Sequence, residues 1–151
     1  MKIIPAERRH FEKIFELSQL LILWELAEIN PFVWSTRAWI SEHLGNFFVV
    51  EHNGEVLGVM ALKTHFDGNM EIDSIVVPPE FQGKGVGKLL IDFAKTFARF
   101  NHEKVLSLGT FSVYKKVEFY KSQGFEDLGI AYYFISKYGH RFPYHNMRII
   151  L

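Results

Sequence analysis

The sequence feature that most constrains the fold is a glycine-rich stretch, Gln82-Gly83-Lys84-Gly85-Val86-Gly87, that separates a predicted strand from a predicted helix. The strand pattern covers residues 70–77 and ends at two prolines, which cannot donate to a strand ladder. Helix N-termini leave backbone N–H groups unpaired and carry partial positive charge, and glycines let an anion approach them closely. The stretch therefore predicts a pyrophosphate cradle, with a plain strand-to-helix turn and solvated lysines as the alternative.

The spacing of these glycines excludes two well-known phosphate-binding loops. A P-loop has four residues between its first glycine and the Gly-Lys-Ser/Thr group, whereas Gly83 and Gly87 have three residues between them. Leu89 also stands where a P-loop requires a magnesium-binding hydroxyl. A dinucleotide-binding fold needs G-x-G-x-x-G and an acidic residue about twenty positions later. This stretch reads G-x-G-x-G, and Val105 falls near the acidic position.

Apolar periodicity predicts helices and strands along the rest of the chain. Asn53-Gly54 and Asp67-Gly68 predict turns that join three consecutive strands into an antiparallel meander. The predicted elements are a strand at 2–4, helices at about 5–21 and 35–44, strands at 47–52, 56–64 and 70–77, a helix at 87–100, a strand at 105–108, a helix at 114–122, and strands from 125 and over 147–151. This order predicts an α+β (mixed α/β) fold in which a helix crossover joins two strands that lie side by side.

The composition predicts one domain, residues 1–151, with a self-sufficient core. Apolar residues make up 48% of the chain and charged residues 23%, as in an average globular protein. Seventeen basic residues balance seventeen acidic ones, so the net charge indicates neither nucleic acid nor an anionic membrane as a partner. The longest apolar run is far shorter than the ~20 residues of a membrane span, and the N-terminus has no signal-peptide pattern. We therefore expect a cytoplasmic protein.

The chain contains no cysteine. This absence excludes disulfides, thiolate catalysis and cysteine-ligated zinc, and it suits a reducing compartment. The seven histidines form no pair at metal-ligand spacing, so we expect no metal site.

The glycine-rich stretch and a second motif resemble the GNAT superfamily of acetyl-CoA-dependent N-acetyltransferases. The family signature, Gln/Arg-x-x-Gly-x-Gly/Ala between a strand and a helix, is matched by Gln82, Gly85 and Gly87. Phe119-Tyr120-Lys121-Ser122-Gln123-Gly124-Phe125 is similar to the family's Phe-Tyr-x-x-x-Gly-Phe, and the order of predicted elements matches over nearly the whole chain. The resemblance implies a GNAT-like fold: a central, mostly antiparallel sheet flanked by helices, in which a splayed pair of strands binds the cofactor.

The resemblance further implies that acetyl-CoA is the acetyl-donor co-substrate and that main-chain groups hold it. Backbone N–H groups of the loop would bind the pyrophosphate, and the end of the preceding strand would pair with the pantetheine arm as an added strand. One amide of that strand would also polarise the thioester carbonyl. Burial in the sheet is the alternative reading for the strand residues, and it is compatible with main-chain contacts. The implied cofactor-binding residues are Ile75, Val76, Val77, Gln82, Gly83, Lys84, Gly85, Val86, Gly87, Lys88 and Tyr120.

Glu71 and Tyr120 are the candidate catalytic residues. An alkylammonium with a pKa near ~10 needs a base or a water relay at neutral pH. Glu71 stands at the spacing before the loop where some family members place this base, and we rank it above Asp73, which shares its strand face roughly 7 Å away. Ordinary solvent-facing carboxylates are the alternative. Tyr120 occupies the position of the family's tyrosine, which protonates the leaving thiolate, and a core aromatic is its alternative.

We therefore predict an N-acetyltransferase that moves acetyl from acetyl-CoA to a primary amine of a small molecule or a protein, by direct attack in a ternary complex. The alternative is a catalytically weak GNAT-like domain that binds acetyl-CoA as a sensor or scaffold. One departure from the family bears on this choice, because the Asn often found seven residues before the tyrosine is Val113 here. Ser112 is a candidate replacement for its contact with the cofactor.

The acceptor is the least constrained part of the prediction. The resemblance allows a homodimer, and no motif identifies the amine. Four aromatic residues cluster where the family builds its acceptor pocket, and core packing is the alternative reading for most of them. These residues are Trp24, Phe32, Trp34 and Trp39.

Overall fold

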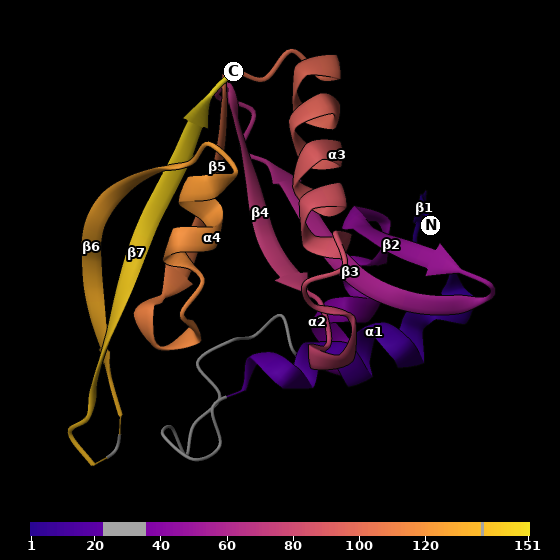
Figure 1. Ribbon diagram of the computed structural model, residues 1–151, viewed down its shortest axis with the longest axis horizontal. Helices are drawn as coiled ribbons and strands as arrows, with labels where there is room; N and C mark the ends of the chain where they lie inside the picture. The colour runs from indigo at the N-terminus through magenta and orange to yellow at the C-terminus, as the bar shows by residue number, and fades with distance from the viewer. Residues whose placement is uncertain (23–35, 137) are drawn as a thin grey trace.

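The structure, a computed structural model, describes residues 1–22, 36–136 and 138–151. Within these ranges seven strands form one sheet in the order β1-β2-β3-β4-β5-β7-β6 (Figure 1). All neighbouring strands pair antiparallel except β4 and β5, which run parallel. The predicted mixed, mostly antiparallel fold is thereby confirmed. The strands are β1 (Lys2–Pro5), β2 (Phe47–His52), β3 (Glu55–Thr64), β4 (Asn69–Val76), β5 (Val105–Phe111), β6 (Glu126–Ile135) and β7 (Arg141–Ile150).

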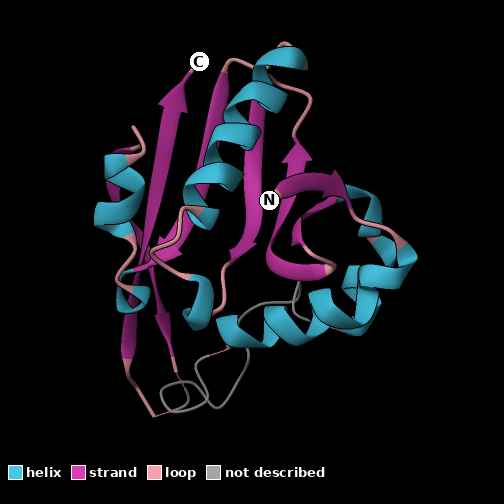
Figure 2. Ribbon diagram, turned by 45° about the vertical axis from the view of Figure 1, so that its right-hand side comes forward, coloured by secondary structure: helices cyan, strands magenta, loops and turns pink. Residues whose placement is uncertain are grey.

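The helices of the described ranges are short, except for the one that follows the glycine-rich loop. The α-helices are α1 (Phe11–Ser18), α2 (Arg37–Glu42), α3 (Val86–Phe100) and α4 (Val117–Ser122). The 3-10 helices are η1 (Arg8–His10), η2 (Gln19–Leu21), η4 (Leu44–Asn46), η5 (Pro79–Phe81) and η6 (Ser112–Tyr114). α3 is the crossover between β4 and β5, as the sequence predicted, and Figure 2 shows it lying across the strands.

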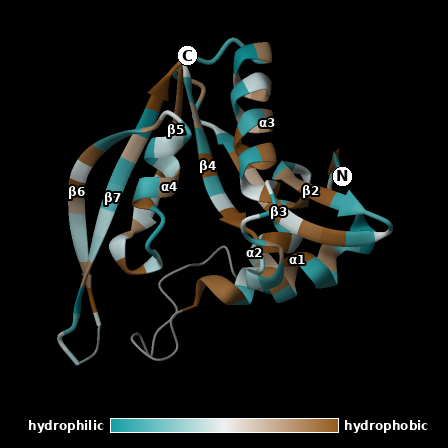
Figure 3. Ribbon diagram, viewed as in Figure 1, coloured by the Kyte–Doolittle hydropathy of each residue, from teal (hydrophilic) through white to brown (hydrophobic). Residues whose placement is uncertain are grey.

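Two apolar clusters pack against the sheet. α3 is amphipathic, with alternating hydrophobic and hydrophilic bands in Figure 3, and it buries Leu90, Ile91 and Ala94 completely. These side chains pack with Met60 and Leu106 of the strands in the first cluster. The second cluster joins α1 and α2 to strand residues of opposite parity, so it covers the other face of the sheet. Its buried residues include Ile14, Ile40, Val49, Val59 and Ala61.

Several predicted element boundaries were wrong. The helix predicted at about 5–21 is divided, because residue 5 ends β1 and α1 covers only Phe11–Ser18 between two 3-10 helices. The helix predicted at 114–122 begins at Val117, because Lys115 has a positive φ of 58° that interrupts helical geometry. The predicted Ser35 cap of the second helix lies outside the described residues, and Thr36 accepts the Trp39 N–H at 3.2 Å.

The largest difference from the sequence prediction is at the C-terminal end. β7 extends over ten residues from Arg141, where the sequence predicted a strand only from residue 147. It pairs with β5 on one side and β6 on the other, so both of its edges are satisfied. The first half of this strand was not predicted from the sequence because it contains Pro143 and polar residues, and proline is disfavoured inside a sheet.

β6 forms one edge of the sheet and exposes a row of large apolar side chains. The exposed residues on this strand are Leu128, Ile130, Tyr132, Tyr133 and Ile135. Two register shifts interrupt its pairing with β7.

In the parts of the chain that the structure describes, no helix has the length and apolarity that crossing a membrane requires.

We predict that Gly58→Ala destabilises the fold by about 1–3 kcal/mol, because the added methyl group overpacks the interface between β3 and α3. A Cβ at Gly58 would lie 2.9 Å from Val86 Cγ1 and 3.3 Å from Leu90 Cδ1, and both side chains are buried. Urea unfolding measures the loss. Gly45→Ala is the control, because nothing lies within 4 Å of a Cβ at Gly45. Equal stability of the two variants would contradict this account.

Candidate active site at the splayed strands

The two parallel strands at the centre of the sheet pair over only four residues and then separate. Asn69 to Ile72 of β4 pair with Val105 to Leu108 of β5. Beyond this point β4 continues beside β3, whereas β5 continues beside β7, and the two strands diverge (Figure 1). The main chain of each strand is therefore unpaired on the side that faces the gap. This is the splayed pair that the resemblance implied.

A β-bulge at Asp73 accompanies the divergence. Ala61 of β3 pairs with Ser74 and Leu62 pairs with Ile72, so Asp73 is an extra residue without a partner on β3. A bulge bends its strand and increases the local twist, which turns the end of β4 away from its parallel neighbour. The bulge also interrupts the strict alternation that the sequence analysis assumed for this strand. Ile75 and Val77 therefore pack against the same cluster as Ile72.

Glu71 and Asp73 lie close enough to interact, but their surroundings differ. Burial, and then the charge of the neighbouring Glu71, raise the pKa of Asp73 to about 6 against the opposing effects of Lys63, His65 and His43. Glu71 lies in the paired part of β4, opposite Ser107. Its Oε2 is 2.6 Å from Nε2 of His65, so one of its oxygens already has a partner. Asp73 is therefore the carboxylate poised near neutral pH.

Tyr120 belongs to the first apolar cluster, with 7% of its surface exposed. Its ring packs edge-on against that of Phe125, with the ring centroids 5.9 Å apart, and at a tilt against that of Phe119, with the centroids 5.4 Å apart. Burial raises its pKa far above the ordinary value for a tyrosine, so the phenol stays protonated and can act as an acid. Tyr114 has a pKa raised by burial and then by Tyr144 and Tyr120, so the three phenols lie within electrostatic reach of one another.

Tyr144 and Gly109 form a feature that the sequence analysis missed. A Cβ at Gly109 would lie 1.8 Å from the hydroxyl of Tyr144, so the phenol occupies space that glycine alone leaves open. Burial raises the pKa of Tyr144 to about 12, with further contributions from Tyr132, Glu71 and Asp73. The hydroxyl therefore lies near the carboxylates across the gap. A glycine inside a strand is the sequence signal that could have revealed this close approach.

The glycine-rich loop presents its backbone at the N-terminus of α3. Gly83 and Gly85 have positive φ angles of 74° and 86°, which only glycine adopts without strain. The first hydrogen bond of the helix runs from Leu89 N–H to Gly85 O, and no side chain caps the helix. The N–H groups of Val86, Gly87 and Lys88 therefore have no partner within the helix.

Gln82 has a structural contact that the motif did not reveal. Its Nε2 donates to Val77 O at 2.8 Å, so the side chain ties the start of the loop to the end of β4. Lys116 Nζ donates to Gln82 Oε1 at 3.3 Å and brings a positive charge from the segment before α4. Lys84 lies in the loop itself. Lys88 donates to Asp92 at 2.5 Å, so its charge is already paired with a carboxylate. Among the described residues, Lys84 and Lys116 contact this loop without pairing with a carboxylate.

A buried polar atom without a partner lies directly after the bulge. Among the described residues, Ser74 Oγ is buried and makes no hydrogen bond. Such an atom is costly in a folded protein unless a ligand or water satisfies it. Together with the open edge of Ile75–Val77 and the glycine cradle, it fits a polar, extended ligand between β4 and β5.

The expected acceptor pocket is only partly described. Trp24, Phe32 and Trp34 lie outside the described residues. Trp39 stacks on His43 at 4.2 Å and meets Phe47 edge-on at 5.9 Å, so it packs against the second apolar cluster.

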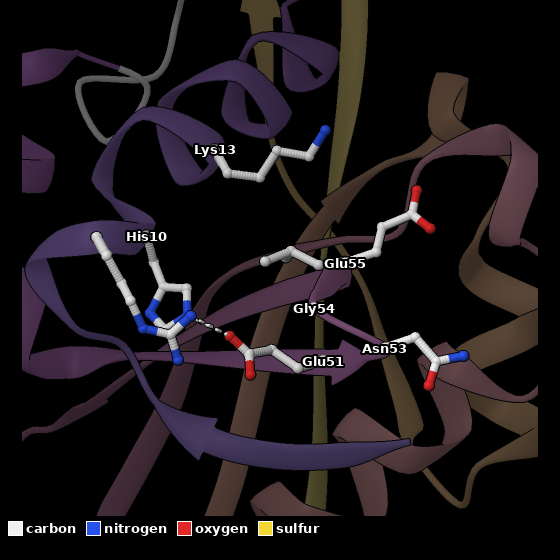
Figure 4. A pocket seen from close by; sticks show the side chains of 8 residues that line it. His10, Lys13, Glu51, Asn53, Gly54 and Glu55 are labelled. Carbon is white, nitrogen blue, oxygen red and sulfur yellow. Dashed lines mark hydrogen bonds and ion pairs between the residues drawn. The ribbon is translucent and has the colours of Figure 1, made fainter.

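A depression beside the β2–β3 hairpin contains a buried hydrogen bond between His10 and Glu51 (Figure 4). His10 Nε2 lies 2.5 Å from Glu51 Oε1, and the Glu7 N–H donates to His10 Nδ1 at 2.9 Å. His10 and then Arg9 hold the pKa of Glu51 below its ordinary value. These contacts join the segment before α1 to β2, remote in sequence from the glycine-rich loop. We assign them a structural role.

Comparison with known proteins supports the resemblance to the GNAT acetyltransferases. The model of the acetyltransferase (GNAT) domain matches residues 43–127, which is more than half of the chain. An uncharacterized N-acetyltransferase of Chlorobaculum tepidum is 32% identical over 97 residues, covering 62% of this chain and 58% of that protein. An uncharacterized N-acetyltransferase of Methanocaldococcus jannaschii is 36% identical over 89 residues, covering 54% of this chain and 39% of that protein.

A solved structure extends the likeness to the whole fold. An acetyltransferase of Bacillus subtilis in complex with CoA superposes with a TM-score of 0.75 at 19% identity, covering 99% of this chain and 98% of that one. The chain belongs to the GNAT acetyltransferase family. The matched segments span about half the length of the curated relatives.

We predict that Asp73→Asn raises the melting temperature at pH 8 and has little effect near pH 4. The pKa of Asp73 in the folded protein, about 6, lies above the ordinary value of 3.8 for an aspartate. Folding is therefore favoured while the group is protonated, and this contribution is lost as the pH rises through 6. Thermal unfolding across this range checks the prediction, with Asp67→Asn as the control. A difference that grows toward low pH would contradict it.

Proposed function

We propose that this chain is an N-acetyltransferase that moves acetyl from acetyl-CoA to a primary amine. The observation that carries the proposal is the coincidence of a splayed parallel strand pair with a glycine cradle at the N-terminus of α3. An extended, anionic thioester fits both features, because the cradle suits a pyrophosphate and the open strand edge suits an amide-containing arm. The names of the curated relatives, both N-acetyltransferases, support the same reaction.

In this proposal the cofactor is held mainly by the main chain. Backbone N–H groups from Gln82 to Lys88 bind the pyrophosphate, with Lys84 as the nearby cation. Ile75, Val76 and Val77 present their backbone to the pantetheine arm, and one of their amides polarises the thioester carbonyl. The coenzyme A in the Bacillus subtilis structure supports acetyl-CoA as the donor.

The base is proposed to come from the Glu71–Asp73 pair. The sequence favoured Glu71, whereas the raised pKa of Asp73 favours Asp73 as the group that takes the proton from the amine. A base is most effective when its pKa lies near the working pH, and the pKa of Asp73 is about 6. Glu71 raises that pKa by its charge and is held by His65. The two carboxylates therefore have different roles in one proton relay.

Tyr120 is proposed as the acid that protonates the departing thiolate. Burial raises the pKa of this phenol far above its ordinary value, so the phenol is protonated at neutral pH. The amine attacks the thioester carbonyl directly, the C–S bond breaks, and the thiolate takes the proton of Tyr120. No covalent enzyme intermediate is needed for this transfer.

The second candidate function is a sensor or scaffold that binds acetyl-CoA without turnover. Val113, in place of the Asn often found in the family, is the observation that favours it. The acceptor is proposed to be an amine on a small molecule or a protein, in a single cytoplasmic domain that forms a homodimer or acts alone. Calorimetry and turnover separate the two functions.

We predict that acetyl-CoA binds the wild-type chain and that Gly85→Ala weakens binding about 10-fold. The left-handed backbone at residue 85 costs a residue with a side chain about 1–2 kcal/mol, and relief of this strain distorts the cradle. Isothermal titration calorimetry measures the change. Gly54→Ala is the matched control, because Gly54 has a similar φ of 77° in a remote hairpin. Absence of binding to the wild type would refute the proposed function, whereas binding without turnover on a broad amine panel would favour the sensor.

We predict that kcat/KM rises with pH through about 6 and that Asp73→Asn removes this rise and lowers kcat by roughly 10²-fold. Glu71→Gln should keep turnover and shift the rise to lower pH, because loss of the Glu71 charge lowers the pKa of Asp73. Thiol release from acetyl-CoA with a reactive amine gives these profiles. The reverse pattern, with turnover lost only in Glu71→Gln, would assign the base to Glu71. Unchanged turnover in Tyr120→Phe would remove the acid assignment.

A further inference from the structure

Three polar side chains form a hydrogen-bonded series on the C-terminal half of the sheet. Ser112 Oγ lies 2.7 Å from His145 Nε2. His145 Nδ1 lies 3.1 Å and 3.2 Å from the two carboxylate oxygens of Asp127. The order hydroxyl, imidazole, carboxylate and these distances match the arrangement that activates a serine nucleophile. The roles are recognised by geometry, because such triads occur on unrelated folds.

The hydrogen bonds define where the protons lie. The Gly129 N–H and then His145 hold the pKa of Asp127 below its ordinary value, so Asp127 is a carboxylate and can only accept. In the neutral form of the imidazole, Nδ1 therefore carries the hydrogen and donates to Asp127. Nε2 is left with its lone pair directed at Ser112, which donates its hydroxyl hydrogen to it. This is the tautomer that a general base requires.

The series is held by three different elements and is partly exposed to solvent. Asp127 belongs to β6, His145 to β7 and Ser112 to η6, directly after the end of β5. The Asp127 side chain is also fixed by the Gly129 N–H at 2.8 Å. The side chains of His145 and Asp127 retain 17% and 25% of their exposed surface. The groups are thus positioned by the sheet without being sealed from solvent.

The series is separate from the proposed amine site. Tyr144, whose hydroxyl lies over Gly109 near the Glu71 and Asp73 carboxylates, is the neighbour of His145 in β7. The two residues pair in regular register with Phe111 and Thr110. Successive side chains of a strand point to opposite faces, so the imidazole lies on the face opposite Tyr144. The series includes neither carboxylate of the proposed base nor Tyr120, and Ser112 is its one member with an expected cofactor contact.

We propose that Ser112 is a nucleophile, activated by His145 and Asp127, that accepts acyl groups from activated esters and thioesters. The Ser112 oxygen attacks the acyl carbonyl while its proton passes to His145 Nε2, and the bond from the carbonyl carbon to the leaving oxygen or sulfur breaks. The leaving group takes the proton from His145. Water, deprotonated by His145, then attacks the acyl carbonyl, the bond from the carbonyl carbon to Ser112 Oγ breaks, and His145 returns the proton to Ser112 Oγ, so that the carboxylic acid and free Ser112 are released. The net reaction is hydrolysis of the ester or thioester.

The first experiment follows hydrolysis without any amine, with p-nitrophenyl acetate and acetyl-CoA in separate arms. The wild type should release product and carry an acetyl group on Ser112 in the mass spectrum. Ser112→Ala should abolish the label, and His145→Gln should lower the rate by about 10²-fold or more. Ser122→Ala is the control, because Ser122 is an exposed serine on α4 whose hydroxyl donates to Phe119 O and accepts from Gln123 Nε2. Release from only one donor identifies which acyl source the site takes.

A second experiment uses the absence of cysteine from the chain. Ser112→Cys introduces a single thiol, and His145 should raise its thiolate fraction. Its alkylation by iodoacetamide at pH 7 should be at least about 10-fold faster than that of Ser122→Cys and should slow when His145→Gln is added. A purely structural series would leave the two thiols equally reactive. Equal alkylation rates, or acetyl groups found on residues other than Ser112, would overturn the proposal while leaving the proposed amine transfer intact.

Discussion

The limited pairing of β4 with β5 is the constraint on which the candidate active site depends. Four residues of parallel ladder hold the two strands together at one end. Beyond them, the extra residue at Asp73 bends β4 away, while β5 stays paired with β7 along its other edge. The gap is therefore a consequence of how the ladders are shared among neighbouring strands. The carboxylates of Glu71 and Asp73, the phenols and the glycine-rich loop are positioned by the strands that border this gap or by the segments that follow them.

The sequence was sufficient for the loop and for the class of fold, because both depend on local rules. Glycines at alternate positions between a strand and an amphipathic helix leave few conformations for the backbone, and Gly83 and Gly85 adopt the positive φ angles that this requires. The site could be predicted only in part, because its main features arise from long-range register. The bulge at Asp73 and the approach of Tyr144 to Gly109 depend on neighbouring strands that no local pattern specifies. Asp127, His145 and Ser112 are likewise joined only by the pairing of β5, β6 and β7.

The electrostatics of the site follow from burial more than from charge pairing. Desolvation is the largest cause of the raised pKa of Asp73 and of Tyr144. A carboxyl group that ionises reluctantly and a phenol that stays protonated are both consequences of a dry environment. The stability lost in burying Asp73 is the physical counterpart of its readiness to bind a proton near neutral pH.

The two register shifts of β6 have a consequence for the outer boundary of the sheet. β6 is an edge strand with several apolar side chains exposed, and such an edge can template the addition of a foreign strand. An incoming strand needs an even row of N–H and C=O groups over several residues. The irregularities around Gly129 and between Ile130 and Tyr132 interrupt that row. The backbone of β6 thus limits growth of the sheet even though its side chains would favour further contact.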